Sequence, residues 1–307
     1  MYDLIIIGSG PAGLSAAVYA KRAGLNMLII EKNPVSGGQI IDTYEVDNYL
    51  GIPGVNGFDL AMKFREHADK LGAEFADASV TAIETVDKGS DTKAPVYKVV
   101  TDNGEFETHT IILATGAHHS KLGIPGEEEF IGKGVSYCAT CDGAFFKDKT
   151  VSVVGGGNTA FQDALYLSKF CHAVYLIHRR DSFRASAYLV SKVKSNSKII
   201  LRTNEVVEEI KGENMVNSLV LKNTVTSAPS AIDTSAVFIA AGRIPNSDFA
   251  KNILTLDKDG YILTDENMQT SVDGIYAVGD VRKTPLRQII TAAADGAVAA
   301  NDISVKM

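Results

Sequence analysis

One local pattern occurs twice in this chain and constrains its fold more than any other feature. Each copy is a short apolar run, a glycine-rich turn and a helical stretch, followed by a second apolar run; the turns are residues 8–13 and 155–160. Short, almost wholly apolar runs are typical of parallel strands buried on both faces. A strand, a G-x-G-x-x-G/A turn and a helix form the dinucleotide-binding unit of Rossmann-like domains. The repeat therefore predicts an α/β protein with two Rossmann-like, three-layer ββα domains.

The residues of such a turn have separate physical roles. One glycine permits the tight turn, the next lets the backbone approach a pyrophosphate, and a small third residue lets the helix pack on the strand. The phosphates are then bound by N–H groups at the helix N-terminus. In the first copy the expected binding residues are Gly8, Gly10, Pro11, Ala12 and Gly13, and in the second they are Gly155, Gly157, Asn158, Thr159 and Ala160.

The two copies differ where the second apolar run ends, and this difference assigns their ligands. The first ends on Glu31, where a carboxylate accepts hydrogen bonds from an adenosine ribose. The second ends on His178, Arg179 and Arg180, with Arg184 close behind. Guanidinium groups bind phosphate in a bidentate manner, which suits a 2′-phosphate. The first site is therefore predicted to bind FAD and the second NADPH; a solvated basic turn is the alternative for the arginines.

Two similar segments mark where the chain passes between the domains. Both are apolar runs that end in small residues, at 111–117 and 237–243, and they bracket the second repeat. A short strand ending on Asp280 and an alanine-rich helix then complete the first domain. We expect a discontinuous FAD domain, residues 1–116 and 243–307, with the NADPH domain, residues 117–242, inserted in it. The polar stretch 87–95 is expected to be an exposed turn.

A pair of cysteines precedes the second repeat. Cys138 and Cys141 lie within disulfide reach, and a helix start at this point lowers a thiol pKa towards the reactive thiolate. A zinc site would need two further ligands, for which Cys171, His118 and His119 are the candidates. We expect a redox pair and no metal, with Cys171 as a buried structural thiol.

An acidic residue, Asp142, directly follows the second cysteine. Thiol–disulfide exchange requires a proton to be moved, so a carboxylate at this position predicts a general acid–base. The alternative is a charge at a helix N-terminus, which has only a small effect on stability.

The composition argues against several other classes of protein. Apolar residues make up 45% and charged residues 22%, as in ordinary globular proteins. The formal net charge of −7 argues against sequence-independent binding of nucleic acid. No apolar run approaches the ~20 residues of a membrane span. Three cysteines are too few for a disulfide scaffold, which favours the reducing cytoplasm.

Together these motifs resemble those of the low-molecular-weight bacterial thioredoxin reductases. The likeness extends from Gly8 to about Asn301 and keeps the family's order of motifs. Besides the two glycine-rich turns it includes residues 37–39, 45–48, 114–116, 138–143, 178–184, 279–280 and 287–288. The resemblance implies a homodimeric thioredoxin-disulfide reductase in which electrons pass from NADPH through FAD to the cysteine pair.

The resemblance also implies roles that the residue pattern alone does not assign. Asp280 would bind the ribitol of FAD, and Arg287 would hold the flavin end with its neighbour. Cys141 would face the flavin, whereas Cys138 would attack thioredoxin or a thioredoxin-like protein. The further FAD contacts would be Gly38, Gln39, Asn48, Thr115, Gly116, Gly279 and Gln288.

Other functions share part of this pattern. A flavin-dependent dithiol oxidase, or a reductase acting on another redoxin or a small dithiol, would keep both nucleotide sites and the cysteine pair. A non-enzymatic redox sensor would not need both nucleotide sites. Ferredoxin-dependent relatives lose the nucleotide glycines and arginines that this chain contains.

Overall fold

The two glycine-rich repeats lie in separate units of the computed structural model, which describes residues 1–43, 45–86 and 95–307. Unit 1 consists of Met1–His118 and Ile244–Met307, and unit 2 of His119–Arg243. Unit 2 is thus an insertion in unit 1, for which the apolar brackets suggested the bounds 117–242. The expected polar turn at 87–95 lies outside the described residues except for Pro95.

Unit 1 is built on a sheet whose parallel strands lie in the order β3-β2-β1-β6-β17. Two more strands, β5 and β4, continue from β6 in antiparallel orientation. The strands are β1 (Tyr2–Ile7), β2 (Met27–Glu31), β3 (Glu74–Asp77), β4 (Val80–Val86), β5 (Val96–Thr101), β6 (Gly104–Leu113) and β17 (Ile275–Ala277). The helices are α1 (Pro11–Arg22), α2 (Gly57–Lys70) and α6 (Ile289–Lys306), with the short 3₁₀ segments η1 (Gly38–Asp42), η3 (Asp248–Ala250) and η4 (Gly279–Val281).

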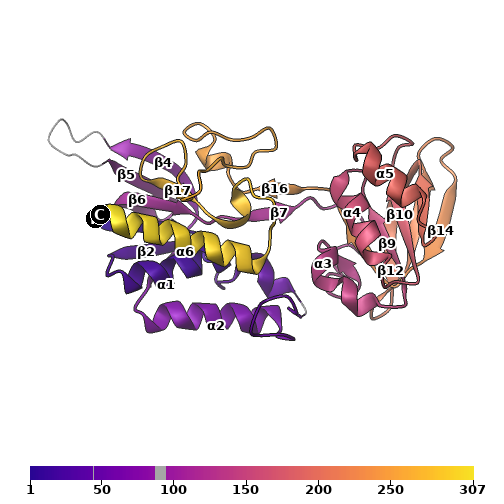
Figure 1. Ribbon diagram of the computed structural model, residues 1–307, viewed down its shortest axis with the longest axis horizontal. Coiled ribbons are helices and arrows are strands. Elements are labelled where there is room, and N and C mark those ends of the chain that lie inside the picture. Colours follow the sequence, from indigo (N-terminus) through magenta and orange to yellow (C-terminus); the bar gives the residue numbers. More distant parts are fainter. Residues whose placement is uncertain (44, 87–94) are drawn as a thin grey trace. The chain divides into compact units, whose positions relative to one another are not determined.

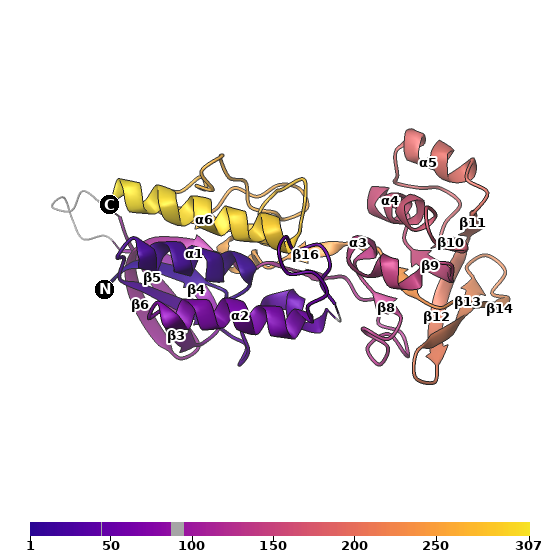
Figure 2. The ribbon, with the colours of Figure 1, turned by 60° about the horizontal axis from the view of Figure 1, so that its bottom comes forward.

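The apolar run in β1 requires a layer on each face of this sheet. Leu4 and Ile6 pack with side chains of α1 and α6, whereas Ile5 and Ile7 pack with apolar residues of β4 and β5. Successive side chains of a strand point to opposite faces, so an unbroken apolar run is buried only between two layers. Figures 1 and 2 show α1, α2 and α6 side by side in the helical layer of this unit.

Unit 2 repeats this arrangement on a smaller scale. Its parallel strands lie in the order β11-β10-β9-β15-β8, and a separate antiparallel sheet has the order β12-β13-β14. The strands are β8 (Val135–Ser136), β9 (Thr150–Val154), β10 (Ala173–His178), β11 (Ile199–Thr203), β12 (Glu205–Gly212), β13 (Val216–Asn223), β14 (Pro229–Asp233) and β15 (Val237–Ile239). The helices are α3 (Ala139–Asp142), α4 (Asn158–Leu167) and α5 (Ala187–Lys194), with the 3₁₀ segment η2 (Gly143–Phe146).

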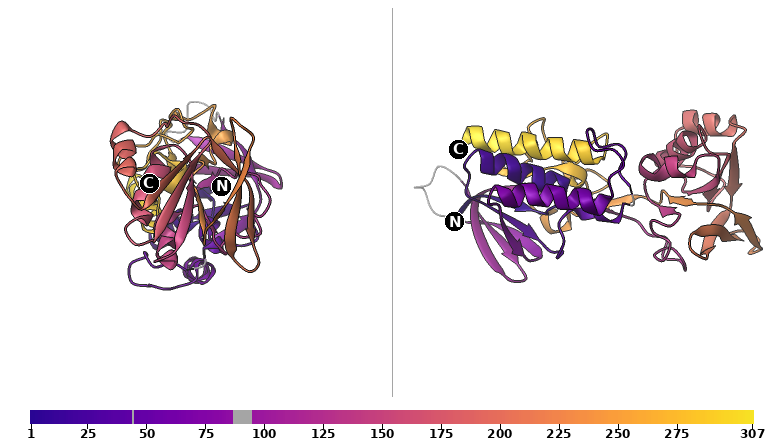
Figure 3. Two further views of the ribbon diagram at one scale, coloured as in Figure 1. Left: turned by 90° about the vertical axis from the view of Figure 1, so that its right-hand side faces the viewer. Right: turned by 90° about the horizontal axis from the view of Figure 1, so that it is seen from below.

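Opposite faces of the parallel sheet in unit 2 again meet different layers. Val151 and Val153 of β9 pack with α4, whereas Val237 and Ile239 of β15 pack with apolar residues of β12 and β13. The left-hand view of Figure 3 shows the antiparallel strands in orange. The prediction of two Rossmann-like domains with three layers each is therefore confirmed.

The two segments that connect the units pair with each other. β7 (Ala117–His119) and β16 (Arg243–Pro245) form a two-stranded sheet. The backbone N–H of Asn246 donates to the carbonyl oxygen of Gly116 at 3.0 Å. The Asn246 side chain donates to the carbonyl of Thr115 at 2.8 Å, and the Thr115 hydroxyl donates to the carbonyl of Asn246 at 2.7 Å. The chain therefore leaves unit 1 and returns to it at one place.

Within residues 1–43, 45–86 and 95–307, no helix is both long enough and apolar enough to span a membrane.

Helices α1 and α6 approach closely because Gly296 has no side chain. A Cβ added to Gly296 would lie 2.1 Å from the carbonyl oxygen of Ala12 and 2.9 Å from the backbone nitrogen of Ala16, both in α1. Displacing the backbone of a helix in a close-packed core costs considerable free energy. The helix-to-helix contact in the core of unit 1 therefore depends on a glycine at this position.

We predict that Gly296→Ala lowers the free energy of unfolding, although alanine favours a helix over glycine by about 1 kcal/mol. Overpacking of a core typically costs roughly 1–3 kcal/mol, and here the clash is with backbone. Urea unfolding followed by circular dichroism measures the effect. Lys63→Ala, at an exposed position of α2 in the same unit, is the control and should change stability little. A Gly296→Ala protein as stable as the parent would contradict this account of the packing.

Candidate functional site

The first glycine-rich turn joins β1 to α1 and shows the close approaches that its glycines predict. A Cβ on Gly8 would lie 2.5 Å from the carbonyl oxygen of Ala114, and one on Gly13 would lie 2.0 Å from that of Gly8. At Gly10 the nearest described atom to such a Cβ is 4.0 Å away. Gly10 is the N-cap of α1 without a side-chain cap, and Pro11 occupies the first helical turn. Open space beside uncapped N–H groups fits a pyrophosphate.

Glu31 ends β2 beside this turn, and its carboxylate is fully engaged. Oε2 accepts hydrogen bonds from the backbone N–H and the hydroxyl of Ser9, each at 2.8 Å. Oε1 accepts from the backbone and side-chain amides of Asn33, at 2.9 and 3.1 Å. Because a carboxylate has about four lone-pair sites, a ribose hydroxyl would take the place of the exposed Asn33 amide. Ser9 was missed in the sequence, since the variable positions of the turn carry no pattern.

Two loops bring further sequence-predicted residues together. Gly38 lies against the turn, because a Cβ added to it would be 3.6 Å from the Cα of Gly10. Gln39 follows it in η1. The side-chain amide of Asn48 donates to Gln288 Oε1 at 2.9 Å, and Gln288 is the N-cap of α6. Asn48 and Gln288 are therefore neighbours despite their separation in sequence.

A half-buried ion pair holds the turn η4, which carries Gly279 and Asp280. Arg282 donates from Nε to Asp295 Oδ2 at 2.7 Å and from Nη2 to Oδ1 at 3.2 Å. The N–H of Gly279 donates to the same Oδ2 at 3.0 Å. Bidentate pairing fixes the geometry of both partners. Asp295 was also missed; the signal for it is a carboxylate in the middle of an alanine-rich helix.

Arg287 carries a buried donor that no described residue satisfies. Its Nε has no hydrogen-bond partner in the described part of the chain, while its guanidinium carbon lies 4.0 Å from the centre of the Tyr261 ring. Leaving a buried donor unpaired costs about 1–3 kcal/mol. The atom therefore fits a ligand that offers an acceptor at this point.

The second glycine-rich turn joins β9 to α4 and repeats the approaches of the first. A Cβ on Gly155 would lie 2.7 Å from the carbonyl oxygen of Ala240. Ala160, the small third residue, is fully buried, and Thr159 beside it is exposed. A Cβ on Gly157 would meet no described atom within 4 Å, and Gly157 caps α4 without a side-chain bond. This turn also leaves room for a pyrophosphate.

The turn is tied directly to the basic segment that follows β10. The carbonyl oxygen of Gly156 accepts a hydrogen bond from the N–H of Arg184 at 2.8 Å. Asn158 Oδ1 accepts one from the N–H of Ser186 at 2.8 Å. The His178 ring fills the place of a Gly156 side chain, with Nδ1 2.4 Å from an added Cβ. Asn158 and His178 thus have structural contacts at this site.

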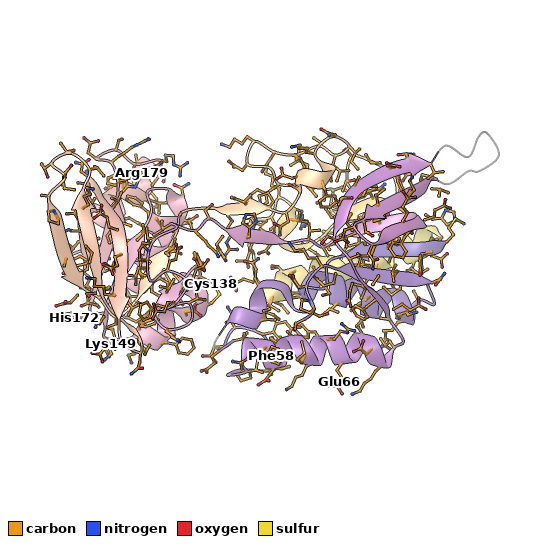
Figure 4. The ribbon with its side chains drawn as sticks, turned by 180° about the vertical axis from the view of Figure 1, so that it is seen from behind. Phe58, Glu66, Cys138, Lys149, His172 and Arg179 are labelled. Carbon is orange, nitrogen blue, oxygen red and sulfur yellow. A yellow bond between two sulfur atoms is a disulfide. The ribbon has the colours of Figure 1, made fainter. Side chains whose placement is uncertain are left out.

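The cationic groups gather at the carboxyl end of β10. Arg179, Arg180 and Arg184 are exposed, and Figure 4 labels Arg179 there. Burial lowers the pKa of His178, a hydrogen bond to the Ser182 carbonyl raises it, and the three arginines lower it again. A neutral His178 beside exposed guanidinium groups leaves the arginines as the anion-binding groups.

A disulfide joins Cys138 and Cys141, whose Cα atoms lie 5.3 Å apart. Cys138 is the N-cap of α3, and its carbonyl oxygen accepts hydrogen bonds from the N–H groups of Cys141 and Asp142 at 3.2 and 3.1 Å. The Thr140 hydroxyl lies 3.5 Å from Cys138 Sγ. Figure 4 labels Cys138. Residues three and four apart share one side of a helical turn, so α3 gathers both sulfurs and the carboxyl group.

Asp142 is half-buried and makes one side-chain hydrogen bond to a described residue. Its Oδ2 accepts from the Ser136 hydroxyl at 2.6 Å. Burial raises the pKa of Asp142, and the hydrogen bond from Ser136 lowers it. A carboxyl group with a raised pKa exchanges protons more readily near neutral pH. Ser136 was not identified from the sequence, because a lone serine two residues before a cysteine has no distinctive pattern.

The remaining candidates from the sequence have structural partners. Cys171 is fully buried, and its thiol donates to the carbonyl oxygen of Phe146 at 3.3 Å. Burial raises the pKa of Cys171 to about 11. His118 Nδ1 lies 2.8 Å from Asn246 Oδ1, and the His119 ring stacks on Tyr137. Over the described ranges, no three metal-binding side chains gather into a cluster.

Comparisons with known proteins agree with this geometry. The family model for pyridine nucleotide-disulphide oxidoreductases matches residues 2–296. The thioredoxin reductase of Bacillus subtilis (strain 168) is 44% identical over 305 residues, which cover 99% of this chain and 94% of that protein.

Solved structures give the same result. The crystal structure of thioredoxin reductase from Streptococcus pyogenes MGAS5005 has a TM-score of 0.93 at 41% identity, covering 100% of this chain and 98% of that one. The Lactococcus lactis thioredoxin reductase in its FR conformation has a TM-score of 0.66 at 42% identity, with 100% of both chains covered. The chain therefore belongs to the pyridine nucleotide-disulphide oxidoreductases and, among them, to the thioredoxin reductase family.

Proposed function

We propose that this protein is a thioredoxin-disulfide reductase that carries electrons from NADPH through FAD to the Cys138–Cys141 pair and on to thioredoxin. The observation that carries the proposal is a disulfide at the start of α3, in the same unit as a glycine-rich turn flanked by arginines. A disulfide that closes so short a loop removes little entropy from the unfolded chain. Its use is therefore chemical, and a pyridine nucleotide is the natural source of its electrons.

The residues of unit 1 fit FAD. Gly10 leaves space beside the uncapped start of α1, where the N–H groups and the helix dipole favour a pyrophosphate. Glu31 is placed to accept from the adenosine ribose, a group that FMN lacks. The Arg282–Asp295 pair orients η4, from which Asp280 would bind the ribitol, and the buried Nε of Arg287 would donate to the flavin end.

The residues of unit 2 fit NADPH. Gly157 and the start of α4 would bind the pyrophosphate, as Gly10 and α1 would in unit 1. Arg179, Arg180 and Arg184 would bind the 2′-phosphate, since exposed guanidinium groups provide bidentate donors without a buried charge. Asn158 and His178 would support this site by holding the basic segment against the turn.

When bound, the flavin would supply the two-electron redox chemistry that links hydride donation by NADPH to reduction of the disulfide. The cysteines then exchange with thioredoxin without further cofactors. The Cys138 thiolate attacks the thioredoxin disulfide and forms a mixed disulfide, and the Cys141 thiolate attacks Cys138 to release reduced thioredoxin. The two protons of the cysteine thiols end on the two thioredoxin sulfurs, and Asp142 is placed to move them.

Two further features belong to this proposal. The protein would act as a homodimer, and the outer face of α6 exposes Ile290, Val298 and Val305 to a second copy. It would work in the cytoplasm, where NADPH is available to reduce the cysteine pair after each catalytic cycle. A dithiol oxidase or a reductase of another redoxin remains the alternative, and it is an outcome of the activity test below.

The purified protein should be yellow and should contain about one FAD per chain. Release of the cofactor by heat, followed by chromatography against FAD and FMN standards, identifies it. The expectation follows from Glu31, which is placed to accept from an adenosine ribose, a group that FAD has and FMN lacks. Recovery of FMN, or failure to bind added FAD, would contradict the assignment of unit 1.

NADPH oxidation should accelerate strongly when oxidised thioredoxin is added. Cys138→Ser and Cys141→Ser should each abolish thioredoxin reduction, while NADPH still bleaches the flavin, because the disulfide acts after the flavin. Cys171→Ser is the matched control; its thiol is buried and its pKa is raised to about 11, so turnover should stay near that of the parent. Rapid NADPH oxidation with oxygen alone, unaffected by thioredoxin, would favour the dithiol oxidase instead.

NADPH should be strongly preferred over NADH. Each charge-assisted hydrogen bond to the 2′-phosphate contributes roughly 1.5–3 kcal/mol, so two of them imply about a hundredfold preference or more. The double variant Arg179→Gln/Arg180→Gln should raise the KM for NADPH and leave that for NADH nearly unchanged. Lys194→Gln, at an exposed cation of the same unit, controls for a general loss of charge. Equal use of both nucleotides by the parent enzyme would refute the role of the arginines.

A further inference from the structure

Ser136 links the backbone of the redox pair to the carboxyl group beside it. The residue lies in β8, is 5% exposed, and has a hydroxyl with two close partners. The N–H of Cys138 donates to Ser136 Oγ at 3.0 Å, and Ser136 Oγ donates to Asp142 Oδ2 at 2.6 Å. The chain of contacts runs from the amide of the attacking cysteine, through one hydroxyl, to the carboxyl group.

The direction of the hydroxyl hydrogen follows from these distances. A serine hydroxyl has one hydrogen to donate. The Cys138 carbonyl oxygen also lies near Ser136 Oγ, but at 3.4 Å rather than 2.6 Å. Short O–H···O contacts are typical of carboxylate acceptors, and a hydroxyl that accepts from an amide becomes a better donor. The hydrogen therefore points to Asp142 Oδ2.

We propose that Ser136 is a positioning residue for proton transfer at the redox pair, because its hydroxyl occupies Oδ2 of Asp142 and leaves Oδ1 as the oxygen that exchanges the proton. Oδ1 has no hydrogen-bond partner among the described residues. In the protonated acid, Oδ2 keeps its bond to Ser136 as the carbonyl oxygen, and the proton resides on Oδ1. This inference rests on the proposed function, in which Asp142 is the acid–base of thiol exchange.

The proton balance of the exchange shows what this arrangement does. One thiol of the reduced pair loses its proton to Asp142 Oδ1 and attacks the thioredoxin disulfide, so that one S–S bond breaks and another forms. The same proton then passes to the thioredoxin sulfur that leaves. The second thiol repeats the cycle, closing the Cys138–Cys141 bond and completing the thioredoxin dithiol. A carboxyl group whose proton sat on Oδ2 would have to break its bond to Ser136 in each half of the cycle.

Neighbouring charged side chains do not mask the influence of the Ser136 hydroxyl on the pKa of Asp142. The elements with the most extensive contact to α3 are η2 and α4, whose titratable side chains are Asp163 and Tyr166, both on α4, and β8, which supplies Ser136, has none. Burial raises the pKa of Asp142 and Ser136 lowers it, with no contribution from any charged side chain of the described residues. The two cysteine sulfurs, once reduced, are the other titratable groups at this place. Removal of the Ser136 hydroxyl should therefore raise the pKa of Asp142.

The test is Ser136→Ala in the flavin-loaded enzyme, assayed with thioredoxin across the pH range in which the parent is active. We expect kcat to fall about tenfold, as part of the 10²–10⁴-fold that acid–base catalysis contributes. We expect the limb of the pH profile that Asp142 controls to move to higher pH, whether its acid or its base form limits turnover. The KM values for thioredoxin and NADPH, and the rate of flavin bleaching by NADPH, should stay unchanged.

Three matched variants complete the experiment. Ser136→Thr keeps the hydroxyl and should restore the parent profile. Ser152→Ala removes another buried hydroxyl of unit 2, bonded to Thr234 at 3.1 Å, and should leave the profile unchanged. Asp142→Asn tests the acid–base itself.

The outcomes separate the inference from the function on which it rests. Loss of turnover in Asp142→Asn with a parental kcat and pH profile in Ser136→Ala would overturn the role of Ser136 alone. A slow Ser136→Ala enzyme with an unshifted profile would show a merely structural serine and would overturn it too. Normal turnover of Asp142→Asn would remove the acid–base role of Asp142 and the inference with it.

Discussion

A backbone-to-backbone approach at the carboxyl ends of the parallel strands organises both units of this protein. In unit 1 the N–H of Gly8 donates to the carbonyl oxygen of Ile30, and an added Cβ on Gly8 would strike Ala114. In unit 2 the N–H of Gly155 donates to the carbonyl oxygen of Ile177, and an added Cβ on Gly155 would strike Ala240. Only glycine permits these contacts, because a side chain would separate the first strand from its neighbour. The helix that follows each turn can then begin with its N–H groups free.

This constraint explains why the ligand-binding candidates collect where they do. Ligands of open α/β sheets bind beyond the carboxyl ends of the strands. Glu31 ends β2, the basic segment follows β10, and Asp280 follows β17, so each unit presents its specific groups at the same edge as its glycine turn. The crossings through Thr115 and Gly242 begin at that edge as well, directly after the strands that the glycines contact. One edge of each sheet thus carries both the candidate nucleotide-binding groups and the connection between the units.

The redox pair depends on a different and more local arrangement. Helix α3 is a single turn, so its macrodipole is small and the chemistry rests on individual hydrogen bonds. Ser136 arrives from β8, Cys138 begins the turn, and Asp142 ends it. Burial raises the pKa of the carboxyl group, while the hydroxyl lowers it and holds its orientation. Cys171, by contrast, is fully buried and donates its thiol hydrogen to the carbonyl oxygen of Phe146, and its raised pKa keeps it a thiol.

The sequence by itself determined the class of fold, because two apolar runs followed by glycine turns are sufficient to specify two parallel, doubly covered sheets. It also indicated the chemistry of the cysteine pair and the sign of the charge after each second strand. Only the tertiary structure decided the contacts that depend on residues far apart, such as Asn48 with Gln288, Arg282 with Asp295, and Gly296 with α1. The same holds for Ser136, whose hydroxyl is recognised as important only when the fold places it between the Cys138 N–H and the Asp142 carboxyl group. Periodicity and turn chemistry are local and can be read along the chain, whereas the partner of a polar side chain is set by packing in three dimensions.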